Sequence, residues 1–178
     1  TDSYRISKIA KKYGAEVPFL RSKKLANDFA TTSEVVIDCI KRISSQTTKY
    51  HFCLYPTTTL LFKKDLINSF KKIKQNDFDL LIPVLDYNVS PYRALKFVGK
   101  NRIEYKLKKF AHSRFQDLPR LCHDSGSFYI YKTKSLLKQN GKLPKKTTYY
   151  FLDRYRAVNI DTMSDFKFAE FMFRCLKK

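Results

Sequence analysis

The sequence predicts an α/β fold whose central sheet is covered by helices on both faces. Residues 50–55 and 79–84 are short apolar runs, and a helical apolar pattern over residues 65–73 lies between them. Few polar residues alternate with apolar ones in either run, which is typical of parallel strands buried on both faces. The 178 residues are 43% apolar, enough for a sizeable core, so we assign residues 1–178 to a single domain.

Two further helices are expected before the first of these strands. Apolar residues at helical spacing precede Gly14, where the first helix should end after a cap at Thr1 or Asp2. Residues 31–33 are candidate caps for the second helix. Its expected apolar face consists of Val36, Cys39, Ile40 and Ile43.

The C-terminal half adds a hairpin, a strand and two helices. Residues 93–98 and 103–107 predict an exposed hairpin, which we place in an insertion spanning residues 88–120. After it, the pattern predicts a strand at 127–131, a short helix at 133–139, a loop at 141–148 and a final helix at about 163–176. The final helix is expected to turn four apolar side chains inward, namely Phe166, Ala169, Phe173 and Leu176.

The net charge of +20 is the most unusual bulk property of the chain. It favours polyanionic partners, but no nucleic-acid-binding motif accompanies it and the lysines lie mostly in pairs on expected helix faces. We therefore attribute the charge to compositional drift and solvated surfaces, and expect no nucleic-acid partner. No run approaches the roughly 18 apolar residues of a membrane span, so we expect a cytoplasmic protein without a membrane partner.

The cysteines and the start of the chain set two further expectations. The four cysteines are scattered and the three histidines do not join them, which argues against disulfides and a zinc site. Cys39 and Cys175 lie in helical apolar patterns and are expected to be buried thiols. A doubly wound sheet normally begins with a strand and a phosphate-binding turn, whereas this chain begins with a helix. Either that strand is missing or the fold is a different one.

Six segments carry a family resemblance. They are Ala10–Leu20 (AKKYGAEVPFL), Leu25–Thr32 (LANDFATT), Tyr55–Thr57 (YPT), Arg114–Leu118 (RFQDL), His123–Tyr129 (HDSGSFY) and Asn159–Asp165 (NIDTMSD). In this order and spacing, they resemble the acylneuraminate cytidylyltransferases, bacterial CMP-sugar synthetases that activate nine-carbon acidic sugars. The RFQDL and HDSGSFY segments are more similar to the pseudaminic acid branch than to the sialic acid branch.

The resemblance implies a Rossmann-like nucleotidyltransferase fold and transfer of CMP from CTP to a nonulosonic acid, with release of pyrophosphate, for surface glycan or flagellin glycosylation. It implies a Mg²⁺ cofactor held by Asp161 and Asn159, with Asp161 as the catalytic residue. It places Arg21 and Thr32 at the nucleotide, and the insertion hairpin at a homodimer contact. The residues that it places at the sugar are Tyr55, Thr57, His123, Ser125 and Tyr129.

Each candidate residue also has a purely structural explanation. The alternatives are a solvated basic face for Arg21, a helix cap for Thr32 and for the pair Asp161–Thr162, a packed core position with a locally satisfied hydroxyl for Tyr129, and a structural hydrogen-bonded pair for His123 with Asp124.

The chain also departs from the family pattern. Nothing in it matches the family's first strand and phosphate-binding loop. Asn159 stands where the family has aspartate, Thr59 where it has proline, and Phe115 where a small polar residue is common. These departures predict a truncated chain whose activity depends on the missing segment. The alternatives are a basic nucleic-acid-binding module and a catalytically dead remnant that serves as an interaction domain.

Overall fold

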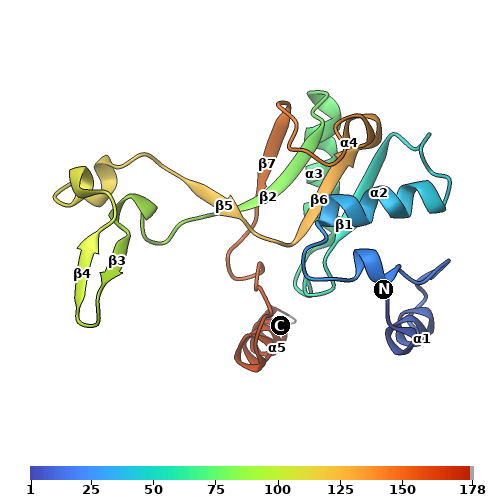
Figure 1. Cartoon of the computed structure of the whole chain (residues 1–178), viewed down its shortest axis with the longest axis horizontal. Helices are drawn as coiled ribbons and strands as arrows, with labels where there is room; N and C mark the ends of the chain where they lie inside the picture. Colours follow the sequence, from blue (N-terminus) through green and yellow to red (C-terminus); the bar gives the residue numbers. More distant parts are fainter. Residues whose placement is uncertain (177–178) are drawn as a thin grey trace. The chain divides into compact units, whose positions relative to one another are not determined.

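A computed structural model gives the fold, and residues 1–176 are the part of the chain that the structure describes. The helices are α1 (Tyr4–Lys12), α2 (Thr32–Arg42), α3 (Lys63–Gln75), α4 (Thr133–Lys138) and α5 (Met163–Leu176) (Figure 1). The strands are β1 (Tyr50–Leu54), β2 (Leu80–Asp86), β3 (Leu95–Val98), β4 (Arg102–Tyr105), β5 (Cys122–Asp124), β6 (Phe128–Lys132) and β7 (Thr147–Phe151).

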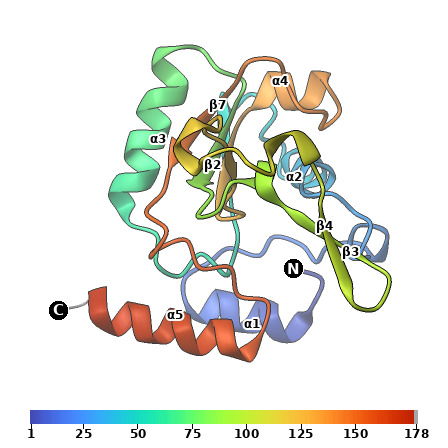
Figure 2. The ribbon, with the colours of Figure 1, turned by 90° about the vertical axis from the view of Figure 1, so that its left-hand side faces the viewer.

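The strands form one larger sheet and one hairpin. The order in the larger sheet is β1-β6-β2-β5, and β7 also pairs with β2. Both β5 and β6 run antiparallel to β2, with Val84 opposite Asp124 and Leu81 opposite Ile130. The strands β3 and β4 form a separate antiparallel arm, visible in Figure 2, within the predicted insertion.

The expectation of a parallel sheet was wrong, because β5 and β6 both pair antiparallel with β2. The strands β1 and β2 are linked by α3 as predicted, but β6 lies between them in the sheet. Two strands joined by a crossover helix need not be adjacent in the sheet. Here β6, which is antiparallel to β2, lies between β1 and β2. Coverage of both faces also holds only for β2: in β1, Phe52 and Leu54 are 41% and 48% exposed. A continuous apolar run therefore identifies neither the covered faces nor the neighbouring strand.

The chain divides into two compact units, whose boundaries fall inside β1, α3, β2, β6 and β7. The first unit comprises Thr1–Cys53, Lys72–Leu81 and Ile130–Thr148, and the second comprises Leu54–Lys71, Ile82–Tyr129 and the chain from Tyr149 onward. In the first unit α2 contacts α4, and the buried apolar residues are Ile37, Ile40, Ile73, Leu80, Leu81, Ile130, Tyr131 and Leu136. The second unit buries Leu60, Val84, Phe128, Leu152 and Ala169.

Local capping explains where the N-terminal helices begin. Ser3, rather than Thr1 or Asp2, caps α1 by accepting a hydrogen bond from the Ile6 amide. The helix α2 begins with a capping box in which Thr31 accepts from the Glu34 amide and the Glu34 carboxylate accepts from the Thr31 amide. The hydrogen bonds from the Thr31 backbone and side chain lower the pKa of Glu34.

Several packing and strand predictions were wrong. Cys39 and Cys175 are exposed rather than buried. Of the four α5 residues expected to face inward, Ala169 is buried, whereas Phe166, Phe173 and Leu176 are 39–51% exposed. The strand β7 begins inside the predicted loop 141–148, and β5 was not expected at all. No helix in the described part of the chain has both the length and the apolar character needed to cross a membrane.

Candidate functional site

The turn between β5 and β6 is organised around Asp124. One carboxylate oxygen of Asp124 accepts a hydrogen bond from the Gly126 amide at 2.8 Å, and the other accepts from the Tyr129 hydroxyl at 2.6 Å. Gly126 has a φ of 63°, a left-handed conformation that glycine adopts without the steric penalty of a Cβ atom. The Ser125 amide bonds to the Pro83 carbonyl at 3.0 Å and fixes this turn against β2. The HDSGSFY segment therefore forms one rigid turn.

The loop after β1 lies directly against this turn. The Tyr55 amide and the Thr58 hydroxyl both donate to the Ser127 carbonyl, at 3.1 and 2.6 Å. The rings of Tyr55 and Tyr129 meet edge to face with 5.9 Å between their centroids. The structure thus brings Tyr55 and Thr57 into the same region as Ser125 and Tyr129. The Tyr129 hydroxyl donates to Asp124, so its polar end is satisfied locally, as the structural explanation of this residue expects.

His123 lies on one wall of an open cleft of about 600 Å³. Its Nδ1 bonds to the Asp124 backbone carbonyl at 2.8 Å, so Nδ1 carries the proton and Nε2 can accept a hydrogen bond. His123 and Asp124 thus form a hydrogen-bonded pair, through the Asp124 backbone rather than its carboxylate. The His123 ring packs on Tyr87 at a centroid distance of 4.8 Å. The other residues lining the cleft are Leu85, Asp86, Asn88, Val89, Arg154, Tyr155 and Phe168.

The charges at this cleft favour an acidic ligand. The guanidinium of Arg120 holds both oxygens of Asp86 at 2.8 and 2.7 Å, and these hydrogen bonds and its charge lower the pKa of that carboxyl. Arg154 is exposed and makes no hydrogen bond or ion pair within residues 1–176. The charge of Arg154 also helps to lower the pKa of Asp86, and its guanidinium shares the cleft wall with His123. This combination suits a carboxylate with neighbouring hydroxyl groups.

The candidate metal residues lie just before α5. The Asn159 amide group donates to Asp161 Oδ2 at 2.5 Å. Of the expected Asp161–Thr162 cap, Thr162 rather than the Asp161 side chain caps α5, since its hydroxyl accepts from the Asp165 amide at 3.3 Å. The Asp165 carboxylate in turn accepts from the Thr162 amide at 2.8 Å and from its hydroxyl at 2.7 Å. Those hydrogen bonds lower the pKa of Asp165. The Asp161 carboxylate therefore does not cap α5 and remains available as a ligand.

The first unit holds the two candidate nucleotide residues. Thr31 is the cap of α2 and Thr32 is the first helical residue, so the helix-cap explanation of Thr32 was wrong. Arg21 pairs with Asp2 at 3.3 Å, and its Nε is buried without a hydrogen-bond partner. It lines a mainly apolar cleft of about 330 Å³ between α1 and α2. The Arg21 side chain is 32% exposed, and its buried Nε donor lacks an acceptor, which is costly.

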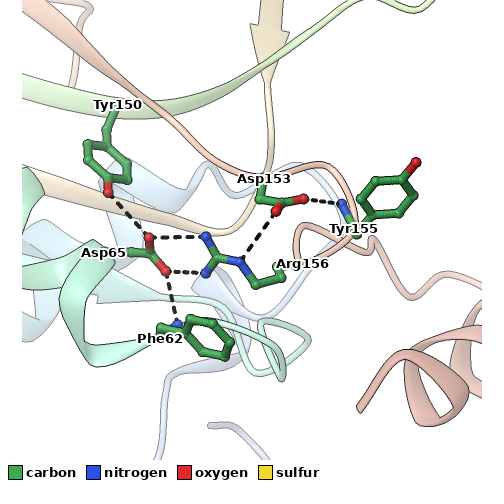
Figure 3. A network of polar contacts seen from close by, with 6 residues as sticks. All are labelled: Phe62, Asp65, Tyr150, Asp153, Tyr155 and Arg156. Carbon is green, nitrogen blue, oxygen red and sulfur yellow. Dashed lines mark hydrogen bonds and ion pairs between the residues drawn. The ribbon is translucent and has the colours of Figure 1, made fainter. Parts of the chain in front are cut away.

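Sequence reasoning missed a buried polar network in the second unit (Figure 3). Asp65, only 1% exposed, accepts hydrogen bonds from Arg156 through both terminal guanidinium nitrogens, from the Tyr150 hydroxyl at 3.2 Å and from the Phe62 amide at 3.1 Å. Burial alone would raise the pKa of the Asp65 carboxyl, but these hydrogen bonds and the charge of Arg156 together hold it below its usual value.

The signals that these residues leave in the sequence are weak. Asp124 lies inside the HDSGSFY segment, yet the resemblance places only its neighbours His123, Ser125 and Tyr129 at the sugar. An aspartate in the first turn of α3 is typical of a capping residue, which Asp65 also is, since it accepts from the Phe62 amide. Nothing local indicates its partner, because Arg156 lies 91 positions later in the chain.

Comparison with known proteins agrees with the resemblance in the six segments. A pseudaminic acid cytidylyltransferase of Campylobacter jejuni (serotype O:23/36, strain 81-176) is 32% identical over 176 residues, covering 98% of this chain and 76% of the relative. The post-translational flagellin modification protein B of Campylobacter coli is 32% identical over 182 residues, covering 98% and 75%. A CMP-N,N'-diacetyllegionaminic acid synthase of C. jejuni is 32% identical over 181 residues, covering 97% and 74%. No family model matches the chain.

A solved structure shares the fold. The CMP:2-keto-3-deoxy-manno-octonic acid synthetase complexed with CTP superposes with a TM-score of 0.64 at 8% identity, covering 99% of this chain and 79% of that one. This likeness confirms the predicted α/β nucleotidyltransferase fold and carries no further conclusion. The sequence relatives carry the identification, because the chain spans about three quarters of their length at 32% identity. The chain therefore belongs to the acylneuraminate/pseudaminic acid cytidylyltransferase family of CMP-sugar synthetases, which are nucleotidyltransferases.

Proposed function

We propose that this chain transfers CMP from CTP to pseudaminic acid, with release of pyrophosphate. The anomeric hydroxyl of the sugar attacks the α-phosphorus of CTP, the bond to the β-phosphate oxygen breaks, and the hydroxyl proton leaves to solvent or a nearby base. Two relatives of similar identity are named for pseudaminic acid and for N,N'-diacetyllegionaminic acid, which supports a nonulosonic acid as the acceptor. The pseudaminic branch is the narrower part of the proposal.

The observation that carries the proposal is the cleft in which His123 lies beside Arg154. Its volume of about 600 Å³ is in the usual range for small-molecule sites. Arg154 supplies a cation for the sugar carboxylate, and His123 Nε2 accepts from a sugar hydroxyl. Tyr55, Thr57 and the rigid Ser125–Tyr129 turn form the neighbouring surface on which the sugar is oriented. Arg21 and Thr32 are assigned to the nucleotide, because the buried Arg21 Nε lacks an acceptor that a base or ribose oxygen would provide.

The residues near α5 fit Mg²⁺ only in combination with a triphosphate. Mg²⁺ is usually bound by one or two carboxylates together with substrate phosphates and water, and Asp161 offers one such carboxylate. The described residues contain no group of three or more His, Cys, Asp or Glu side chains that could hold a metal alone. When bound with CTP by Asp161 and Asn159, Mg²⁺ would neutralise charge on the phosphates. The neutral amide of Asn159 should make this affinity lower than two carboxylates would.

The assembly and location follow from the same proposal. We assign residues 88–120 to a homodimer contact within a single catalytic domain, because Phe97 and Ile103 of the β3–β4 arm are 89% and 58% exposed. We place the reaction in the cytoplasm, where CTP is supplied.

Pyrophosphate release tests the proposed function. The chain is incubated with CTP, Mg²⁺ and one of three sugars: pseudaminic acid, N-acetylneuraminate or N,N'-diacetyllegionaminic acid. We expect release with pseudaminic acid, a loss of at least about 100-fold in Asp161→Ala, and no change in Asp77→Asn, whose side chain pairs with Lys132 in the first unit. The assay is repeated with the remaining quarter of a C. jejuni relative supplied separately. No release with any sugar in either arm contradicts the proposal.

A further inference from the structure

The segment from Leu152 to Thr162 carries the candidate metal residues and is anchored at only a few points. At its start the Leu152 amide bonds to the Val84 carbonyl at 3.0 Å, and at its end Thr162 caps α5. Between residues 157 and 160, the one hydrogen bond in the described chain is that from Asn159 to Asp161. Arg156 is therefore the last residue before Asn159 whose side chain is held by hydrogen bonds. The position of its side chain constrains the path of residues 157–161.

The side chain of Arg156 is held by three residues. Its terminal nitrogens bond to both oxygens of Asp65, and its Nε lies 4.0 Å from Asp153. The guanidinium carbon lies 4.4 Å from the centroid of the Phe62 ring, which covers one face. Only 11% of the side chain is exposed. A planar fork fixed at both ends by carboxylate oxygens and stacked on a ring has little rotational freedom.

Asp65 is equally constrained on the other side. It stands in the first turn of α3, and its bond to the Phe62 amide ties it to the loop that runs from Tyr55 to Phe62. That loop carries Tyr55 and Thr57 and is fixed to the β5–β6 turn through the Ser127 carbonyl. The ion pair between Asp65 and Arg156 therefore links the segment proposed to bind metal to the segment proposed to orient the sugar, within one compact unit.

We propose that Asp65 and Arg156 are positioning residues that hold the Asn159–Asp161 segment in the geometry needed to bind a metal–nucleotide complex. This inference rests on the proposed function. Stability alone does not require such a pair, because an apolar replacement of a buried ion pair is often neutral or stabilising. Unlike apolar packing, a bidentate ion pair fixes the orientation of the arginine side chain. The Asn159–Asp161 segment has few other contacts that could fix its orientation.

The first test needs no activity. Limited trypsin digestion with mass spectrometry measures the rate of cutting after Arg156 in wild type, Asp65→Asn and Leu81→Ala. Leu81 is fully buried in β2, so its truncation destabilises the chain without touching the network and serves as the control for general loss of stability. At temperatures where both variants are equally folded, we expect cutting after Arg156 to be at least tenfold faster in Asp65→Asn than in Leu81→Ala. Equal rates in the two variants overturn the proposal.

A milder variant covers the case in which Asp65→Asn does not fold. Tyr150→Phe removes one hydroxyl, which donates to Asp65 at 3.2 Å, and leaves the ring and the ion pair in place. We expect cutting after Arg156 to be two- to threefold faster than in wild type, with no change after Lys100 in the exposed β3–β4 turn. A Tyr150→Phe protein that is cut like wild type at both positions contradicts the proposal.

The second test measures binding of Mn²⁺ to the chain in the presence of CTP without sugar, so that no turnover occurs. Asp65→Asn should weaken Mn²⁺ binding about tenfold, whereas in an Asp161→Ala background the same change should have no effect. Full affinity in Asp65→Asn overturns the positioning role. If wild type shows no Mn²⁺ binding that depends on Asp161, the metal role in the proposed function fails, and the trypsin rates still decide whether the ion pair orders this segment.

Discussion

Replacing Asp65 with asparagine should cost a large part of the folding free energy. The side chain keeps its shape, but the buried guanidinium of Arg156 loses its buried counter-ion and keeps only the half-exposed Asp153 at 4.0 Å. Asp65 is 1% exposed and the Arg156 side chain 11% exposed, so water cannot replace the lost charge. Removing one partner of a buried ion pair typically costs about 3–5 kcal/mol. Since small domains are stable by only about 5–15 kcal/mol, Asp65→Asn should shift the urea midpoint strongly.

The stabilisation by Asp65 should depend on pH in a defined direction. The folded-state pKa of Asp65 is lower than the ordinary value near 4 of an aspartate in an unfolded chain. Its contribution is therefore complete above about pH 5 and is lost as the pH falls through the lowered folded-state pKa. The free-energy difference between wild type and Asp65→Asn should be greatest near neutral pH and should shrink in acid.

Urea unfolding followed by circular dichroism from pH 2.5 to 7 measures both effects. Asp77→Asn is the matched control, because Asp77 also pairs with a cation, Lys132, at 2.7 Å, but its side chain is 60% exposed. Exposed pairs contribute little, so this variant should unfold at the wild-type urea concentration. If Asp65→Asn shifts the midpoint no more than Asp77→Asn does, or if its effect is independent of pH, the account of a buried, charged network is refuted.

Three further substitutions test other parts of the structure. Gly141→Ala should destabilise the fold by about 2–4 kcal/mol, because the φ of Gly141 is 79° and a Cβ there would lie 2.7 Å from the Cβ of Ser33. The control Gly99→Ala, at a φ of 66° with no atom nearby, should cost only about 1–2 kcal/mol. Equal urea midpoints for the two variants would refute the close contact at Gly141. Thr31→Ala should cost about 1 kcal/mol by removing the cap of α2, measured by thermal unfolding, and an unchanged melting temperature would contradict the capping box. Asn159→Asp should lower the Mg²⁺ concentration needed for half-maximal pyrophosphate release, and a higher requirement would argue against a metal ligand at this position.

The sequence was most informative where periodicity is strong and local. The helices α1, α2, α3 and α5 and the hairpin β3–β4 were expected within a few residues of their observed bounds. By contrast, β5 has three residues and begins with exposed Cys122, so it carries no apolar period. The strand β7 begins with two threonines after a lysine-rich stretch, a composition that also suits a loop. Both strands exist because β2 offers them unpaired backbone groups, which is a tertiary cause.

The predicted site residues divide in the same way. The HDSGSFY segment and the loop after β1 were predicted as parts of one site, and the structure joins them through the Ser127 carbonyl and the rings of Tyr55 and Tyr129. Their roles in catalysis stay predictions. Arg154 lacks a local signal altogether, because an exposed arginine is ordinary in a chain with 36 basic residues. Only its place on the wall of the same cleft as His123 distinguishes it.

The excess of positive charge also explains why ion pairs alone could not have identified the central network. With 36 basic residues against 16 acidic ones, nearly every carboxylate can find a cation, and most of the observed pairs lie at the surface, where they contribute little. Burial, not pairing, is the discriminating property. Among residues 1–176, Asp65 is the one charged residue that belongs to the buried set. Such a charge must be satisfied in one geometry, so it fixes its partner, and through Arg156 it constrains the segment that carries Asp161.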